Sequence, residues 1–206
     1  MKNKEISSYL EELNPNPECP LDYRVDYELL IATVLSAQST DVQVNKVTKV
    51  LFEKYDLESL SKANLDDVIN IIRPTGNMTK KSKYIIEIAN RLLRDHNGKV
   101  PNDREYLESL PGVGRKTTNV VLATIFNEQA FAVDTHIERV AKRLGIAAEK
   151  DSVLKTEEKL IKFFKGEDFG KKHLQVLLFG RYICKSQKPL CDQCKLKKYC
   201  KNSKCT

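Results

Sequence analysis

Several features that would point to other protein classes are missing from this chain of 206 residues. It has no run of eighteen apolar residues, which argues against a membrane-spanning helix. Its first residues, MKNKEISSYLEELNPNP, lack the apolar core of a secretion signal. No stretch alternates apolar and polar residues as a half-buried strand does. We therefore expect a cytoplasmic, all-α protein with no membrane partner.

Apolar residues recur at helical spacing along almost the whole chain. Besides a short amphipathic helix at the N-terminus, the sequence predicts helices over 27–38, 41–55, 65–73, 81–98, 103–110, 114–126, 134–145, 152–164 and 171–184.

The net charge of +7 is concentrated at the C-terminal end. Residues 181–206 hold eight basic residues and only one acid, Asp192, so the rest of the chain is close to neutral. A local basic excess favours a polyanionic partner such as nucleic acid, although solubility alone also explains many exposed lysines.

Four of the six cysteines fall within seventeen residues, with the spacing Cys184-x6-Cys191-x2-Cys194-x5-Cys200. In a cytosolic chain such clustering favours a metal or cluster site over disulfides. Zinc also accepts four thiolates, and the spacing alone leaves it open, although zinc ribbons usually pair two C-x2-C knuckles. The other two, Cys19 and Cys205, are interpreted as a structural thiol and a free thiol in the tail.

Residues 110–119 read LPGVGRKTTN, between two expected helices. Gly112 and Gly114 allow a tight turn with backbone N–H groups pointing outward, at the start of a helix whose dipole favours an anion. A DNA phosphate suits this place, with no base read. An ordinary helix–helix turn is the simpler interpretation of GVG alone. The basic residues that follow favour the phosphate site.

Two side chains near helix starts could carry chemistry. Lys116 lies in the first turn after the glycines, where the helix dipole disfavours a cation, so its amine is a candidate nucleophile. Thr135 and Glu138 have the spacing of a capping box, which predicts Thr135 as N-cap and Asp134 just before it. Asp134 is then either an ordinary helix-start acid or a carboxylate held ionised near a reacting centre. His136 is interpreted as a packed histidine.

Together these segments resemble one family. LPGVGRKTTNVVL, AVDTHIERV, LLIATVLSAQSTD and the four-cysteine tail occur in the order found in endonuclease III-type DNA glycosylases, across essentially the whole chain. The resemblance implies a two-lobed helix–hairpin–helix fold, with one lobe at residues 22–132. The second lobe combines residues 1–21 and 133–206 and carries a [4Fe–4S] cluster loop at 184–200. The implied partner is double-stranded DNA with oxidised pyrimidines or abasic sites, and the implied state is a monomer.

The resemblance also implies roles for individual residues. Lys116 would attack C1′ of the sugar and form a Schiff base, after which β-elimination breaks the strand on the 3′ side. Asp134 would assist the lysine and stabilise the sugar cation, in a pocket that receives the flipped nucleotide. The resemblance and the local pattern together predict DNA contacts at Gln38, Leu110, Gly112, Val113, Gly114, Arg115, Lys185 and Lys188.

The chain departs from the family at one DNA-contacting position. Relatives often place a bulky apolar wedge where this chain has Asn77, so either Met78 serves as the wedge or insertion is weaker. Two other interpretations compete with the lyase. The related adenine-removing mismatch glycosylase lacks the lysine and usually carries a further C-terminal domain. A non-catalytic DNA-binding module would have no need of Lys116 opposite Asp134.

Overall fold

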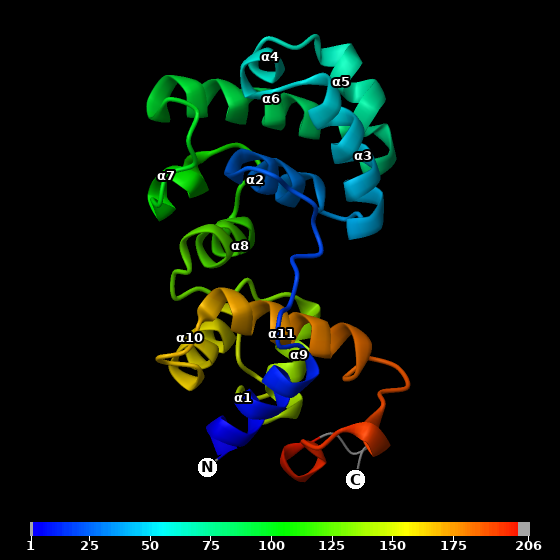
Figure 1. Ribbon diagram of the computed structural model, residues 1–206, viewed down its shortest axis with the longest axis vertical. Helices are drawn as coiled ribbons and strands as arrows, with labels where there is room; N and C mark the ends of the chain where they lie inside the picture. Colours follow the sequence, from blue (N-terminus) through cyan, green and yellow to red (C-terminus); the bar gives the residue numbers. More distant parts are fainter. Residues whose placement is uncertain (1, 202–206) are drawn as a thin grey trace. The chain divides into compact units, whose positions relative to one another are not determined.

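The computed structural model describes residues 2–201, and these contain helices and turns but no strand. This confirms the predicted all-α fold (Figure 1). None of the helices in the described range combines the length and apolar character needed to cross a bilayer. The α-helices are α1 (Lys2–Leu13), α2 (Asp26–Leu35), α3 (Asp41–Lys54), α4 (Leu57–Ser61), α5 (Leu65–Ile72), α6 (Met78–His96), α7 (Arg104–Ser109), α8 (Arg115–Phe126), α9 (Thr135–Arg143), α10 (Val153–Phe163) and α11 (Phe169–Tyr182). Short 3₁₀ turns η1, η2 and η3 cover Arg73–Thr75, Cys191–Gln193 and Lys197–Tyr199.

The chain divides into two compact units, and each is described separately. One is the uninterrupted segment 19–121, and the other combines residues 1–18 with 122–206. The boundaries expected from the sequence lay at 21/22 and 132/133. The second observed boundary falls inside α8, between Val121 and Leu122.

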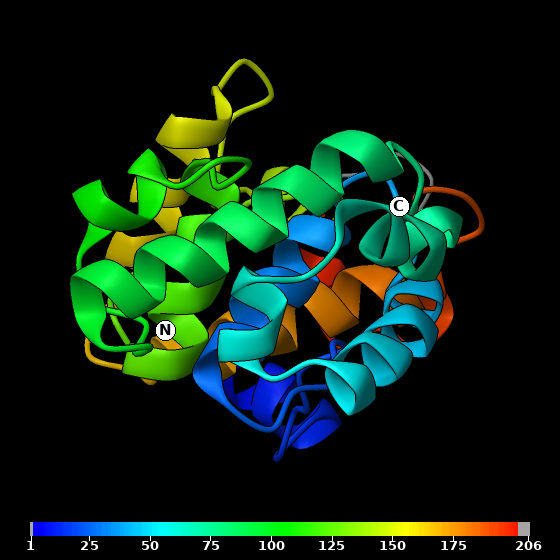
Figure 2. The ribbon, with the colours of Figure 1, turned by 90° about the horizontal axis from the view of Figure 1, so that it is seen from above.

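In unit 19–121, the long helix α6 packs against α2, α4 and α5 (Figures 1 and 2). Its buried stripe, Ile85, Ile88 and Leu92, repeats every three or four residues and faces the core. α2 is buried on nearly all sides, as its apolar sequence predicts. Its Glu28 is also buried, and it is balanced by bonds from the Arg24 side chain and backbone.

The largest differences from the prediction are two helix boundaries and one helix that was not predicted, while several other boundaries differ by one or two residues. α2 ends at Leu35 rather than at residue 38, because Gln38 takes a left-handed backbone conformation with φ 59°. α6 begins at Met78, three residues before the expected start, directly after Asn77 with φ 46°. α4 has no counterpart in the prediction. Its five residues are too few for a periodic signal, and a capping box between Asp56 and Ser59 starts it.

The other unit has an aromatic core. Phe131, Phe164 and Phe179 are fully buried within it, and the Phe131 and Phe164 rings stack with centroids 5.7 Å apart. α11 packs against both α9 and α1. Ile6 and Leu10 bring the apolar face of α1 into this core.

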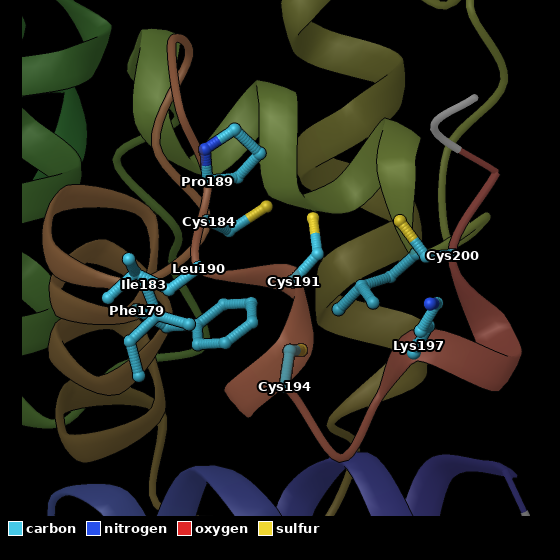
Figure 3. Close-up of a pocket in the computed structure, with 10 residues that line it drawn as sticks. Phe179, Ile183, Cys184, Pro189, Leu190, Cys191, Cys194, Lys197 and Cys200 are labelled. Carbon is cyan, nitrogen blue, oxygen red and sulfur yellow. The ribbon is translucent and has the colours of Figure 1, made fainter. Parts of the chain in front are cut away.

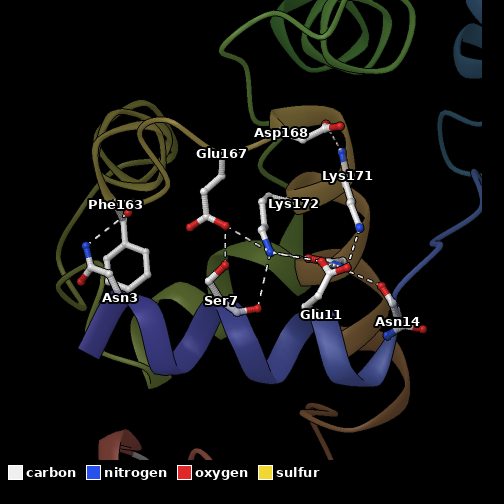
Figure 4. A network of polar contacts seen from close by, with 10 residues as sticks. Asn3, Ser7, Glu11, Asn14, Phe163, Glu167, Asp168, Lys171 and Lys172 are labelled. Carbon is white, nitrogen blue, oxygen red and sulfur yellow. Dashed lines mark hydrogen bonds and ion pairs between the residues drawn. The ribbon is translucent and has the colours of Figure 1, made fainter. Parts of the chain in front are cut away.

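A polar network fastens α1 to α11 (Figure 4). The ammonium group of Lys172, only 4% exposed, lies 3.2 Å from the Glu167 carboxylate and donates to Gln175 at 2.9 Å. Lys171 pairs with Glu11 at 2.6 Å, and Ser7 donates to Glu167. Buried polar groups need such partners, so the network fixes how the N-terminal helix lies on α11.

Candidate functional site

The glycine turn at residues 110–114 is held by packing on both sides. Leu110 and Val113 are buried, and the Val113 N–H donates to the Leu110 carbonyl at 3.1 Å. Gly112 has φ +77°, and a Cβ there would lie 2.4 Å from Cδ2 of Tyr84. Only glycine fits this backbone, because it tolerates positive φ and leaves room for the ring. The turn is therefore sterically specified.

The exposed part of the turn leads directly into α8. Gly112, Gly114, Arg115 and Lys116 are all exposed, and α8 begins at Arg115. The buried side chains of Leu110 and Val113 leave only their backbone to meet a ligand. Lys116 stands in the first turn of the helix, where the dipole is positive and an anion is favoured. The structure thus brings together the predicted hairpin residues and the predicted nucleophile.

Asp134 is itself the N-cap of α9. Its Oδ1 accepts N–H bonds from His136 and Ile137, both at 2.9 Å. The prediction that Thr135 caps this helix in a box with Glu138 is therefore wrong. Glu138 instead pairs with Lys142 at 2.6 Å, one turn further along α9. Aspartate is among the strongest N-caps, because its carboxylate oxygen accepts bonds from N–H groups that the helix leaves without a partner.

Gln38 and Asn77 both lie in short loops of unit 19–121. Each is exposed and each has a positive φ. Gln38 follows the end of α2, whereas Asn77 precedes α6, and Met78 is half-buried. Lys116 belongs to this same unit, whereas Asp134 belongs to the other. Pairing of the lysine with the aspartate stays a prediction.

The four clustered cysteines line one pocket (Figure 3). Its empty space, including the part open to solvent, is about 330 Å³. Apolar side chains of Leu144, Phe179, Ile183 and Leu190 complete much of the wall. Burial raises the pKa of the Cys194 thiol, and the neighbouring Cys184 and Cys200 raise it further. The three thiols therefore share one local environment.

The donor set of this pocket suits an iron–sulfur cluster, since all four candidate ligands are sulfur atoms at one place. Cys184, Cys194 and Cys200 are free thiols. A cluster would take all four sulfur atoms as thiolates. Within residues 2–201, no three His, Cys, Asp or Glu side chains are already arranged around a single metal-ion position, so the fit rests on the donor atoms and the pocket that they line.

Comparisons with known proteins match most of the chain to the family that its sequence motifs resemble. Residues 31–165 match the HhH-GPD superfamily of base excision DNA repair proteins. Endonuclease III of Bacillus subtilis (strain 168) is 43% identical over 202 residues, which cover 96% of this chain and 92% of that protein. Endonuclease III of Escherichia coli (strain K12) is 43% identical over 97% of this chain and 94% of its own.

The chain belongs to the endonuclease III family. A solved structure described as a non-covalent endonuclease III–DNA complex superposes with a TM-score of 0.89 at 44% identity, covering 97% of this chain and 95% of that one. A trapped endonuclease III–DNA covalent intermediate gives 0.88 at 43% identity, with the same coverage. The chain is thus a base excision repair DNA glycosylase with AP lyase activity.

In this endonuclease III-family chain, two arginines of α9 hold the cysteine loop, and the sequence analysis missed both. Arg143 donates to the Lys185 carbonyl at 2.7 Å and lies 3.4 Å from Sγ of Cys184. Arg139 donates to the carbonyls of Gly180 and Cys184 at 2.7 and 3.0 Å. Their spacing of four residues places both on one face of α9. The four-residue spacing of these arginines was the feature of the sequence that could have revealed them.

Two lysines in the loop between Cys184 and Cys191 are predicted to contact DNA, and such contacts require exposed side chains. Lys185 and Lys188 are exposed, and Lys188 has φ 46°. A bond from the Leu190 N–H to the Ile183 carbonyl, at 3.0 Å, closes this loop. Of the two remaining cysteines, Cys19 is a half-buried thiol, and Cys205 lies outside the described residues.

Proposed function

We propose that this enzyme removes oxidised pyrimidines from double-stranded DNA and cuts the strand at the resulting abasic site, with Lys116 as its nucleophile. The observation that carries the proposal is the exposed position of Lys116 in the first turn of α8, directly after a turn that only glycine can make. A phosphate held at the turn would bring the adjoining sugar within reach of the amine.

In the proposed reaction, the neutral amine of Lys116 forms a bond to C1′ while the bond from C1′ to the base breaks. The base leaves with the electron pair and takes up a proton. Loss of the lysine proton and opening of the sugar ring give a Schiff base between Nζ and C1′. Removal of a C2′ proton then expels the 3′ phosphate by β-elimination, and water releases the lysine.

Asp134 is proposed to support this chemistry as a carboxylate. Its two bonds from backbone N–H groups engage Oδ1, and neither engages Oδ2. An ionised carboxylate stabilises the positive charge that develops on the sugar as the base leaves. It is a weak base, so it would assist the lysine mainly through its charge.

We also propose that Cys184, Cys191, Cys194 and Cys200 hold a [4Fe–4S] cluster. The shared pocket with its apolar wall supports this assignment. A cluster would fix the loop between Cys184 and Cys191, and no step of the reaction passes through it. Lys185 and Lys188 on this loop would contact DNA phosphates and add affinity without reading bases. We expect a monomer that works with the chromosomal DNA in the cytoplasm.

Borohydride trapping tests the nucleophile. The protein is incubated with a duplex containing one abasic site, and borohydride reduces the Schiff base to a stable covalent adduct. We expect an adduct with the unaltered chain and none with Lys116→Ala. Lys155→Ala is the matched control, because Lys155 is an exposed lysine in the first turn of α10.

Each other result has a defined meaning. An adduct that persists in Lys116→Ala would assign the nucleophile to another residue. No adduct with the unaltered chain would support a binding module. Iron and sulfide analysis, with a visible absorption spectrum, separates a [4Fe–4S] cluster from zinc. Comparing duplexes with oxidised pyrimidines and with adenine mispairs tests the substrate.

A further inference from the structure

We propose that Lys81 is a positioning residue for DNA binding, whose ammonium group joins the two loops carrying Gln38 and Asn77 into one rigid support. This inference rests on the proposed function in one respect, the DNA contacts that the sequence predicts for Gln38 and for the position of Asn77. Lys81 lies in the first turn of α6 and is 5% exposed. It belongs to none of the motifs in the sequence.

The ammonium group makes three hydrogen bonds, all to backbone carbonyls. Nζ donates to Leu35 at 2.8 Å, to Ala37 at 2.9 Å and to Thr75 at 2.7 Å. An ammonium group has three donors, so these acceptors use its full capacity. A neutral amine has only two donors and would leave one carbonyl unpaired.

The bonded carbonyls adjoin the exposed residues of both loops. The Ala37 carbonyl shares a peptide plane with the N–H of Gln38, so its bond to Lys81 fixes the orientation of that plane. The Thr75 carbonyl likewise shares a plane with Gly76, which precedes Asn77. Gln38, Gly76 and Asn77 all have positive φ, at 59°, 69° and 46°. Such backbone persists when surrounding contacts determine it, and Lys81 supplies a contact to each loop.

A purely structural role is the alternative. The Leu35 and Ala37 carbonyls lie at the C-terminal end of α2, where a cation is favoured by the dipole, so Lys81 could serve only to cap that helix. The third bond, to Thr75 in the other loop, is not needed for such a cap. Capping alone predicts a loss of stability, whereas positioning also predicts a loss of discrimination between damaged and intact DNA.

The experiment compares Lys81→Met with Lys172→Met, which removes an equally buried lysine from the other unit. Affinity is measured for a duplex carrying a stable abasic-site analogue and for the matched intact duplex. We expect Lys81→Met to weaken binding to the abasic duplex at least tenfold and to the intact duplex less than twofold. At saturating DNA, the rate of borohydride-trapped adduct formation should stay within threefold. Lys172→Met should leave the ratio of the two affinities unchanged.

A double-mutant cycle tests whether Lys81 acts through the loops. In a Gln38→Ala/Asn77→Ala background, we expect Lys81→Met to cost less than threefold in abasic-duplex affinity, because the side chains that it positions are gone. A cost unchanged by that background, or an unchanged affinity ratio in Lys81→Met, would overturn the proposal. So would a Gln38→Ala/Asn77→Ala variant that binds as tightly as the unaltered chain.

Lys81→Gln covers the case in which Lys81→Met does not fold. Its amide keeps two N–H donors without a charge and should give a smaller loss of discrimination in the same direction. Failure of the proposed function itself would appear separately, as no adduct with the unaltered chain.

Discussion

The turn at residues 110–114 and the loop at residues 184–190 both place lysines beside proposed DNA phosphates, but they are held by different means. The turn is fixed by its own backbone and by buried neighbours, with Gly112 packed on Tyr84. The loop is held mainly by Arg139 and Arg143, which reach its carbonyls from about 40 residues earlier in the sequence.

This difference separates two ways of making a surface rigid. The turn is specified sterically, so a single added methyl group should disrupt it. The loop is specified by side-chain donors, so it should loosen gradually as donors are removed. The turn can therefore be recognised in the sequence by its glycines. The arginines that support the loop can be recognised only once the position of α9 against the loop is known.

The largest effect should come from Gly112→Ala. The new Cβ would meet the Tyr84 ring and would force an alanine to keep φ +77°. Strain and overpacking together should cost about 3 kcal/mol of unfolding free energy, measured by urea denaturation.

Gly114→Ala is the control for this substitution. A Cβ at Gly114 has no heavy atom within 4 Å, and its φ is not in the left-handed range. Its cost should stay below about 0.5 kcal/mol. Equal losses for the two variants would show that the turn is not sterically specified.

An intermediate effect should follow from Arg143→Ala. The variant removes donors to Lys185 and Ser186 carbonyls, which should cost about 1–2 kcal/mol and expose the loop. Trypsin should cut after Lys185 faster than in the unaltered chain, whereas the bond between Lys188 and Pro189 resists trypsin in both. Lys142→Ala loses only the partly exposed ion pair with Glu138, so trypsin should cut this variant at the same rate as the unaltered chain. Unchanged cleavage in Arg143→Ala would mean that the loop is held in some other way.

The smallest effect on stability should come from Lys185→Ala/Lys188→Ala, because both side chains are exposed. DNA binding should instead show a salt dependence reduced by about 1.8 in the slope of log K against log salt, for two lost phosphate contacts. Lys195→Ala/Lys198→Ala is the matched pair, since these lysines already pair with Glu12 and Glu5. An identical slope in the two variants would contradict the proposed contacts.

The sequence predicted much of the fold because the apolar periodicity of helices such as α6 and α9 is a local property. Lys116 and the four cysteines could be proposed from the sequence for a similar reason, since each belongs to a short motif. Sequence spacing was a weaker guide at α9, where Thr135 and Asp134 are both good caps and the path of the backbone selects Asp134.

Lys81 marks the limit of local reasoning. It stands among other lysines in TKKSK, and nothing in that stretch separates a buried ammonium group from solvated ones. Its burial depends on carbonyls more than 40 residues earlier, at the end of α2, as well as on nearby Thr75. Only the tertiary fold brings these three acceptors to one point.

The union of the first eighteen residues with the C-terminal segment has a consequence for the order of events during synthesis. Residues 19–121 form an uninterrupted unit, and domains generally fold as units during synthesis, the N-terminal one first. Helix α1 is made earlier, but its partners Glu167, Lys171 and Lys172 follow some 160 residues later. The side chains of Ile6 and Leu10 are fully buried in the folded protein. They therefore lack their packing partners until most of the chain has been translated.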